Sequence, residues 1–235
     1  MCFQKNNVML FSALLCSIFF FSCMTNKIDN VINGMIYDGD NEPVSNASIF
    51  FEEKKLAESD IYGHFRLFDV RKLIKSADTE PQLIISKKGY ESSSISFDSD
   101  GNSQLLYIRL YSSEQLLAKT EESLRSKNFD SAESFLQRAE KTGCDTVSAV
   151  YLRAVKDIMQ NKTEDAVSAL EMLLTSGEKE PYIYLLLADC YQFYLIKPEK
   201  AAEYLKMYLT TSYNPSVEER LQSLLAETTS QEPEN

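Results

Sequence analysis

The sequence of 235 residues contains no Trp, a single His and only 7 Gly and 6 Pro. One His excludes most chemistry that requires a pair of imidazoles. The scarcity of Gly and Pro, with 44% hydrophobic and 25% charged residues, argues against a collagen-like, disordered or multi-span membrane chain. Basic residues are also few, with 24 Lys and Arg against 35 Asp and Glu. Because duplex-binding proteins neutralise phosphates with Lys and Arg, the net charge of -11 argues against a nucleic-acid partner.

The first thirty residues indicate export and lie outside the expected fold. Residues 8–21 form an apolar run without a charged side chain, and the residues after Cys23 are polar. Such a run fits a signal-peptide core better than a bilayer-spanning helix, which takes ~20 residues.

Residues 20–23, Phe-Phe-Ser-Cys, resemble a relaxed bacterial lipoprotein lipobox. The resemblance implies a signal peptide over 1–22, lipidation at Cys23 and a lipid-anchored linker over 23–30. Several acyl chains, at ~0.8 kcal/mol per buried methylene, then hold the protein at a membrane. A secretory signal cut elsewhere, or an uncleaved anchor, is the alternative.

The expected location is the bacterial cell envelope. Thr25 rather than Asp follows Met24, so the inner-membrane retention signal of enteric bacteria is absent, which favours the outer membrane. Cys144 and Cys190 are the cysteines of the mature body. Export permits a disulfide between them, but two cysteines do not make up a disulfide framework. The sequence therefore leaves open whether they form a disulfide. Without a CxxC motif, neither a redox motif nor a structural zinc site is supported.

Residues 31–111 are predicted to form a small β-sandwich, because short apolar or alternating runs recur between turn residues. The run Leu83–Ser86 is continuous and is expected at the centre of a sheet. The residue pattern predicts strands at 31–37, 47–51, 61–67, 83–86, 94–97 and 105–110, with an irregular crossover over 73–81.

Several short motifs in this region resemble the carboxypeptidase regulatory-like (transthyretin-like) domain. They are Gly34-x-Ile36-x-Asp38, Pro43-Val44-x-Asn46-Ala47-x-Ile49, Ser59-Asp60-x-x-Gly63-x-Phe65-x-Leu67 and Lys88-Gly89-Tyr90. The resemblance implies a seven-stranded sandwich used as an accessory or binding module, and no site residue is transferred from it. Asn46 departs from the family, which usually has Gly there, whereas Gly63 and Gly89 fit positions with positive φ.

Residues 112–227 change to a helical period, and residues 228–235 are expected to form a frayed, disordered tail. Capping boxes are expected at Ser112-x-x-Gln115 and Asp130-x-x-Glu133, and Asn214-Pro215 is typical of a helix start. Helices are predicted over 113–126, 130–142, 146–160, 164–176, 181–195, 199–211 and 215–227, with stops at Asn128, Gly143, Asn161 and Gly177.

A repeat of 34 to 35 residues runs through these helices. Ala132, Ala166 and Ala201 are each followed four residues later by Leu. With Leu187-Ala188-x-x-Tyr191, this spacing resembles the tetratricopeptide repeat, which implies about three helical hairpins plus a capping helix that stack as a solenoid. Thr120 stands at one small position, and Ala188 lies thirteen residues before Ala201 where twelve are expected. An unrelated α-hairpin bundle is the alternative.

Tyrosines provide the best candidates for binding. Tyr182, Tyr184, Tyr191 and Tyr194 are the candidate partner-binding residues, although aromatics at this spacing more often belong to a core. Residues 113–235 carry 13 Lys and Arg and 21 Asp and Glu, a net charge of -8 that fits a basic or neutral peptide.

Motifs for catalysis, metals or cofactors are not found. His64 is expected on the outer face of a strand, and Leu67 stands where a zinc peptidase would have Glu. Asp98-x-Asp100-x-Asn102 resembles a calcium loop but lacks its Gly and its bidentate Glu. Gly34 and Gly39 have P-loop spacing without the following Lys-Ser/Thr. No catalytic, metal or cofactor residue is therefore predicted.

The sequence favours a non-enzymatic cell-envelope lipoprotein that acts as a binding or scaffold module, with the helical repeats contacting a protein or peptide. The alternative is a surface lipoprotein that binds carbohydrate or a host ligand through the β-sandwich. A hydrolase with carboxylate catalysis is the third hypothesis, for which no carboxylate pair stands out.

Overall fold

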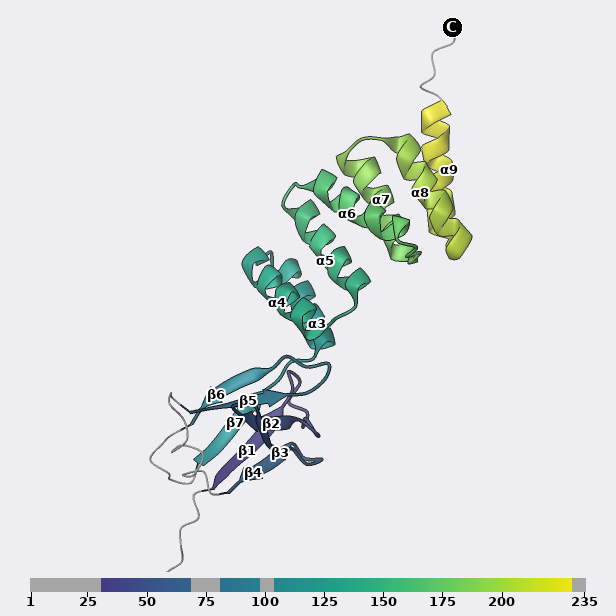
Figure 1. Ribbon diagram of the computed structural model, residues 1–235. Helices are drawn as coiled ribbons and strands as arrows, with labels where there is room; N and C mark the ends of the chain where they lie inside the picture. The colour runs from purple at the N-terminus through teal and green to yellow at the C-terminus, as the bar shows by residue number, and fades with distance from the viewer. Residues whose placement is uncertain (1–30, 69–80, 98–103, 230–235) are drawn as a thin grey trace, which may run out of the picture.

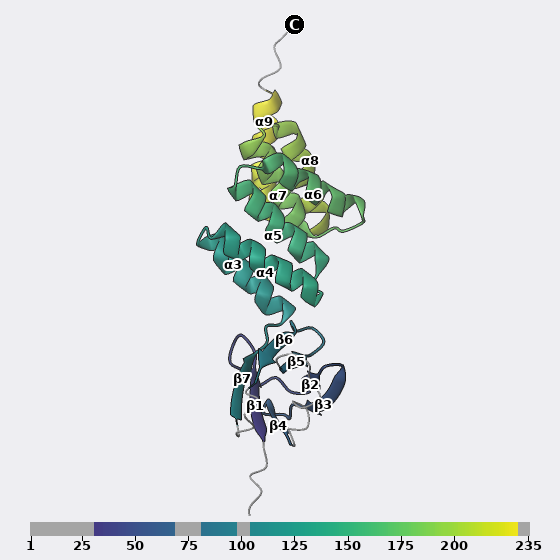
Figure 2. The ribbon, with the colours of Figure 1, turned by 60° about the vertical axis from the view of Figure 1, so that its left-hand side comes forward.

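The computed structural model describes residues 31–68, 81–97 and 104–229. Within them, seven strands precede seven α-helices, and the two regions lie end to end with α9 farthest from the sheets (Figures 1 and 2). The strands are β1 (Ile32–Tyr37), β2 (Ser48–Phe51), β3 (Lys54–Glu58), β4 (His64–Leu67), β5 (Gln82–Ser86), β6 (Ser93–Ser96) and β7 (Gln104–Arg109). The helices are α3 (Ser113–Arg125), α4 (Phe129–Thr142), α5 (Thr146–Met159), α6 (Thr163–Thr175), α7 (Pro181–Asp189), α8 (Pro198–Thr211) and α9 (Pro215–Thr229), with a π-helical turn η1 (Cys190–Tyr194) after α7.

Several predictions fall outside the described residues. They are the signal peptide, Cys23 and the linker over residues 1–30, the interior of the crossover over 73–81, the Asp98 to Asn102 loop and the end of the tail, residues 230–235. Thr228 and Thr229, assigned to the tail, belong instead to α9.

The β region consists of a three-stranded sheet, ordered β4-β1-β7, and a four-stranded sheet, ordered β3-β2-β5-β6. Alternate residues of β1, β2, β4 and β5 point between the sheets, so that Ile36, Ile49, Leu83 and Ile85 are fully buried in one core. β5 lies between β2 and β6, which confirms the expected central position of the Leu83 run.

The residue pattern misses β3 and starts β4 too early. β3 has the sequence KKLAE and lies at the edge of its sheet with no buried residue, so no alternation marks it. The seventh strand that the family resemblance implied is therefore present at this edge. Ile61 and Tyr62, expected in a strand, are exposed in the turn before β4.

The Ser59-Asp60-x-x-Gly63 element joins strands of both sheets through polar contacts. The buried Ser59 hydroxyl donates to the carbonyl of Val44 at 2.7 Å and accepts the N–H of Ala47 at 2.9 Å. Asp60 Oδ1 accepts the N–H groups of Tyr62 and His64. These bonds fix the turn between the sheets, because each pairs a backbone group with a side chain at a set position.

Gly63 completes this turn with the left-handed backbone that the motif predicts. Its φ is +76°, and a Cβ there would lie 2.3 Å from the carbonyl oxygen of Ile36. Gly89 also has positive φ, +81°, as expected. Asn46 has φ +53°, so it takes a left-handed conformation that Asn tolerates better than most residues.

The helices begin and end close to the predicted residues, but two local predictions are wrong. Ser112 and Gln115 form the expected capping box. Asp130 does not cap α4; the Asn128 side chain does, by accepting the N–H of Ser131 at 3.1 Å. Lys127, not Asn128, takes the left-handed conformation after α3, whereas Gly143, Asn161 and Gly177 have the expected positive φ.

The repeated small and large residues lie at equivalent buried positions. Ala132, Ala166 and Ala201 are at most 1% exposed, as are the Leu residues four positions later. Ala154 and Ala188 are buried on the partner helices, and so is Thr120, whose hydroxyl donates to the carbonyl of Leu116. Small residues at these positions let the paired helices approach closely, while the type of repeat is not established by this packing alone.

The extra residue between Ala188 and Ala201 lies in the π-helical turn. A single helix was expected over 181–195, but α7 ends at Asp189 and the chain continues as η1, in which Leu195 N–H donates to the carbonyl of Cys190 at 2.9 Å. This i→i+5 bond accommodates one additional residue in the helix. The spacing of thirteen instead of twelve is therefore a local insertion within an otherwise regular pair of helices.

Candidate binding surfaces

The four tyrosines singled out from the sequence divide between the core and the surface. Tyr184 and Tyr191 are buried, at 7% and 4% exposure, within the hydrophobic cluster that joins α5 to α9. Tyr182 and Tyr194 are exposed, at 37% and 54%. Only the second pair is therefore accessible to a partner, and the first pair belongs to the packing alternative.

Tyr191 forms a polar network with Tyr204 under the surface of α6 and α8. The two rings stack with centroids 5.6 Å apart, and both hydroxyls donate to Glu171 Oε1, at 2.6 and 2.9 Å. Burial and then the Glu171 carboxylate raise the pKa of Tyr191 to about 12, and the same causes raise the pKa of Tyr204. The network is satisfied internally, which indicates a structural role.

Tyr151 on α5 was missed by the sequence reasoning and joins Tyr182 at the surface. Their rings meet edge to face with centroids 4.9 Å apart. Burial, followed by the carboxylates of Asp189 on α7 and Glu121 on α3, raises the pKa of Tyr151. Tyr151 thus lies within the electrostatic reach of α3 and α7 and links the two hydrophobic clusters of the helical region.

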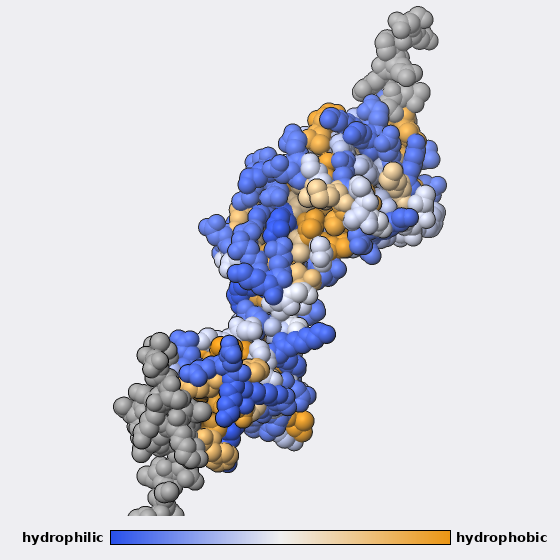
Figure 3. Space-filling model, in the orientation of Figure 1, coloured by the Kyte–Doolittle hydropathy of each residue, from blue (hydrophilic) through white to orange (hydrophobic). Residues whose placement is uncertain are grey.

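We use the term first-helix face for the surface that Glu121, Tyr151, Tyr182 and Asp189 contribute from the first helix of each pair. The face combines two partly exposed aromatic rings with carboxylates. Figure 3 shows one side of the helical region, on which small groups of hydrophobic residues lie among hydrophilic ones. Such a mixture of apolar area and hydrogen-bonding groups is typical of protein-binding surfaces.

Arg220 on α9 closes one end of this face. Its guanidinium pairs with Asp189 at 2.8 Å, donates to Gln192 and lies 5.2 Å from the centre of the Phe193 ring. Phe193 and Tyr194 belong to the π-helical turn and are 61% and 54% exposed. The inserted residue therefore lies where two aromatic side chains reach solvent beside a fixed cation.

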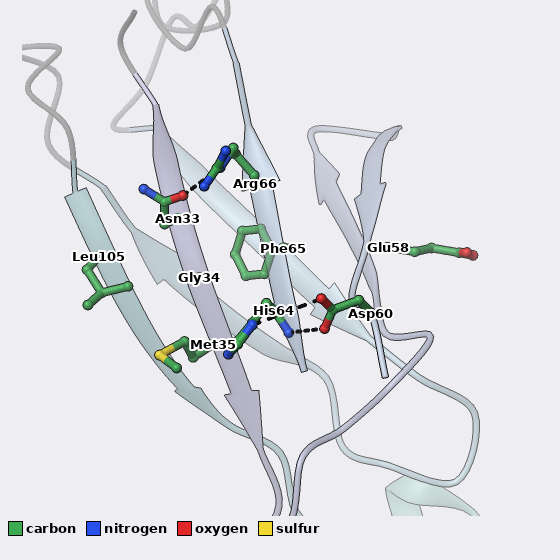
Figure 4. Close-up of a pocket in the computed structure, with 9 residues that line it drawn as sticks. All are labelled: Asn33, Gly34, Met35, Glu58, Asp60, His64, Phe65, Arg66 and Leu105. Carbon is green, nitrogen blue, oxygen red and sulfur yellow. Dashed lines mark hydrogen bonds and ion pairs between the residues drawn. The ribbon is translucent and has the colours of Figure 1, made fainter. Parts of the chain in front are cut away.

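A second surface lies on the outer side of the β4-β1-β7 sheet. Met35 pairs in register with His64 on one side and Tyr107 on the other, and Asn33 pairs in the same way with Arg66 and Leu105. These side chains face away from the core, and all of them except Tyr107 border a shallow hollow of about 520 Å³. In Figure 4, Arg66 donates to Asn33 at 2.9 Å and His64 faces Asp60, with 4.0 Å between Nδ1 and Oδ2.

The outward position confirms the expectation that His64 lies on the exposed face of a strand. Among the residues that the structure describes, no group of three His, Cys, Asp or Glu side chains is arranged to hold a metal ion.

Cys144 and Cys190 are free thiols, and burial raises the pKa of Cys190 to about 11. Over the described ranges, no helix has the length and hydrophobicity needed to cross a bilayer.

Comparison with known proteins identifies no family. No protein-family model matches the sequence, and no curated protein matches it significantly. Two solved structures of a type II cohesin–X-dockerin complex from Acetivibrio cellulolyticus, one an N-terminal and one a C-terminal interface mutant, match at 15% identity with TM-scores of 0.27 and 0.28. The matches cover 35% and 37% of this chain and 57% and 60% of those chains, so less than two thirds of their length is spanned. Values this low carry no inference about fold or function.

Proposed function

We propose that this chain is a non-enzymatic bacterial cell-envelope lipoprotein that binds a protein partner through its helical region. The observation that carries the proposal is the first-helix face, on which the rings of Tyr151 and Tyr182 meet within electrostatic reach of carboxylates from α3 and α7. The helices would stack as about three tetratricopeptide-like repeats with α9 as the cap, and the sandwich would serve as a regulatory-like accessory domain. Stacked repeats offer an extended surface and no inherent reaction.

The charge of the helical half supports a partner segment that is basic or neutral. Residues 113–235 carry a net charge of -8, and Glu121 lies within electrostatic reach of Tyr151. Opposite charge on the partner would speed association and exclude acidic segments. Aromatic anchors flanked by charges are the residues that usually dominate such interfaces.

A paired substitution tests this assignment. Tyr151→Ala with Tyr182→Ala removes the aromatic pair, whereas Leu105→Ala with Tyr107→Ala removes exposed side chains of the β sheet. Full-length proteins carrying either pair are recovered from cells after crosslinking, and the co-purified proteins are quantified. We expect the first pair to lose the partner at least tenfold, a reduction typical of hot-spot residues, and the second pair to retain it. Loss in the second pair alone would contradict the proposal.

The lipid anchor is a separate part of the proposal. Cys23 would carry the acyl chains after removal of residues 1–22, and the absent retention signal favours the outer membrane. Palmitate labelling of the wild type should disappear in Cys23→Ala. Equal labelling of the two proteins would contradict lipidation at Cys23, but it would not bear on the proposed binding face.

The hollow on the β4-β1-β7 sheet favours a second candidate function, a surface lipoprotein that binds carbohydrate or a host ligand. Asn33, His64 and Arg66 offer hydrogen-bonding groups there, and Leu105 offers apolar area. Tyr107, the register partner of Met35 on β7, is also exposed. A sugar ring typically uses both kinds of group. Binding of the wild type to a glycan array, lost in Tyr107→Ala with Arg66→Ala, would favour this candidate.

A further inference from the structure

A second hollow, of about 530 Å³, lies where the β region meets the helical region. One wall is the turn between β5 and β6, which supplies Lys87, Lys88 and Ser92, and the other is the end of α4, which supplies Arg138 and Lys141. It shares no lining residue with the first-helix face or with the hollow on the β4-β1-β7 sheet.

Backbone hydrogen bonds hold the two walls in place. The Gly89 carbonyl accepts the N–H of Ser113 at 3.1 Å, and the Tyr111 carbonyl accepts the N–H of Glu91 at 2.9 Å. These bonds tie the β5–β6 turn to the start of α3. The hollow is therefore a fixed feature of the junction, formed by segments that are distant in the sequence.

Arg138 is fixed at the floor of this hollow. Its Nε and Nη2 donate to the two carboxylate oxygens of Glu91 at 2.9 and 2.7 Å, and its guanidinium carbon lies 5.5 Å from the centre of the Tyr111 ring and 5.2 Å from that of Phe135. Such a bidentate pair is geometrically specific. Nη1 has no acceptor among the described residues, so two N–H groups remain to be satisfied.

The lining carries an excess of positive charge in a strongly acidic chain. Glu91 is already engaged by Arg138, so the ammonium groups of Lys87, Lys88 and Lys141 have no carboxylate partner within the described ranges. The whole chain has 35 Asp and Glu against 24 Lys and Arg, so the basic lining differs from the overall charge of the protein. Like charges held together repel unless an anion joins them.

We propose that this hollow binds a phosphate group, either free or as the headgroup of a phospholipid. A tetrahedral oxyanion accepts several hydrogen bonds at once, from flexible ammonium groups and from the fixed guanidinium of Arg138. Ser92 adds an exposed hydroxyl at the rim. A hollow of about 530 Å³ holds a phosphate with a small substituent.

Calorimetric titration of the full-length protein with inorganic phosphate and with glycerol 3-phosphate tests the proposal. We expect saturable binding, weakened about tenfold by Lys88→Gln with Lys141→Gln, because two charge-assisted contacts are lost. Tighter binding of glycerol 3-phosphate identifies a lipid headgroup as the source, and tighter binding of inorganic phosphate identifies a free phosphate.

Lys54→Gln with Lys206→Gln is the matched control, since it removes the same charge from exposed residues outside the hollow. Circular dichroism establishes that both double variants are folded. Equal weakening of binding in the two double variants would show that binding depends only on the net charge of the protein, which would contradict the proposed site. The proposed site would also be contradicted if the wild type bound neither phosphate compound, or if it bound only polyglutamate, a polyanion without phosphate.

Discussion

The β region and the helical region are held together in different ways. In the β region, single polar residues such as Ser59 and Asp60 fix turns that occur once. In the helical region, the same pair of a buried Ala and a buried Leu recurs in each hairpin. The helical region accommodates the inserted residue of η1 locally, because η1 packs mainly against α6, α7 and α8. We infer that sequence changes at the surface disturb the fold less in the helical region, which carries the candidate binding face, than in the β region.

The largest expected effect is on the helical core. Leu170→Ala removes a fully buried side chain from α6 and should lower the free energy of unfolding by about 2–5 kcal/mol. Met172 lies on the same helix but is 72% exposed, so Met172→Ala is the control and should change stability little. Urea denaturation followed by far-UV circular dichroism measures both. Equal stability of the two variants would show that the repeat positions do not form a core.

A smaller loss of stability is expected from removing a buried polar contact in the β region. Ser59→Ala removes both hydrogen bonds of the buried hydroxyl and leaves the Ala47 N–H without its partner, which should cost about 1–3 kcal/mol. Ser94→Ala, which removes an exposed hydroxyl bonded to Gln82, should cost far less. Hydrogen exchange at strands β1 and β4 would locate the effect. Matching losses in the two variants would contradict this role of Ser59.

The contact between the regions should contribute about 1 kcal/mol. Glu91 and Arg138 are partly exposed, so solvent weakens their ion pair, but its two parallel hydrogen bonds place it above most surface pairs. A double-mutant cycle of Glu91→Gln and Arg138→Met measures the coupling. Zero coupling would mean that the two regions are stabilised independently of this pair.

The tyrosine network should make the free energy of unfolding depend on pH in the alkaline range. The folded pKa of Tyr191, about 12, lies above the unfolded value of 10, so its contribution is present below pH 10 and is lost as pH rises toward 12. Tyr204 shifts in the same direction. Tyr191→Phe with Tyr204→Phe should flatten the fall in stability between pH 10 and 12. An unchanged slope would show that these hydroxyls do not hold their protons more tightly in the folded state.

The sequence predicts the helical region more completely than the β region, for physical reasons. The helical spacing of apolar residues identifies buried positions such as Leu136 and Leu170 even where the repeat of 34 to 35 residues is imperfect. The sequence does not predict β3, because an edge strand with both faces near solvent shows no alternation of apolar and polar residues. It does not predict the π-helical turn either, because only the hydrogen bonds of that turn distinguish it from an α-helix.

The candidate sites are predicted least well. The aromatic run of α7 and η1 contains the exposed Tyr182 and Tyr194, but the sequence does not separate them from the buried Tyr184 and Tyr191. Tyr151 carries no local signal, since its role depends on a contact with the next helical pair. The basic hollow likewise joins segments about fifty residues apart, which no local spacing brings together.

Site-specific photocrosslinking in intact cells tests the central claim most directly. A p-benzoyl-phenylalanine residue replaces Tyr182, Tyr107 or Met172, all of which are exposed. The account predicts a discrete protein adduct at position 182 that is absent at 107 and 172. A discrete adduct at 107 without one at 182 would contradict it and move the binding surface to the β sheet.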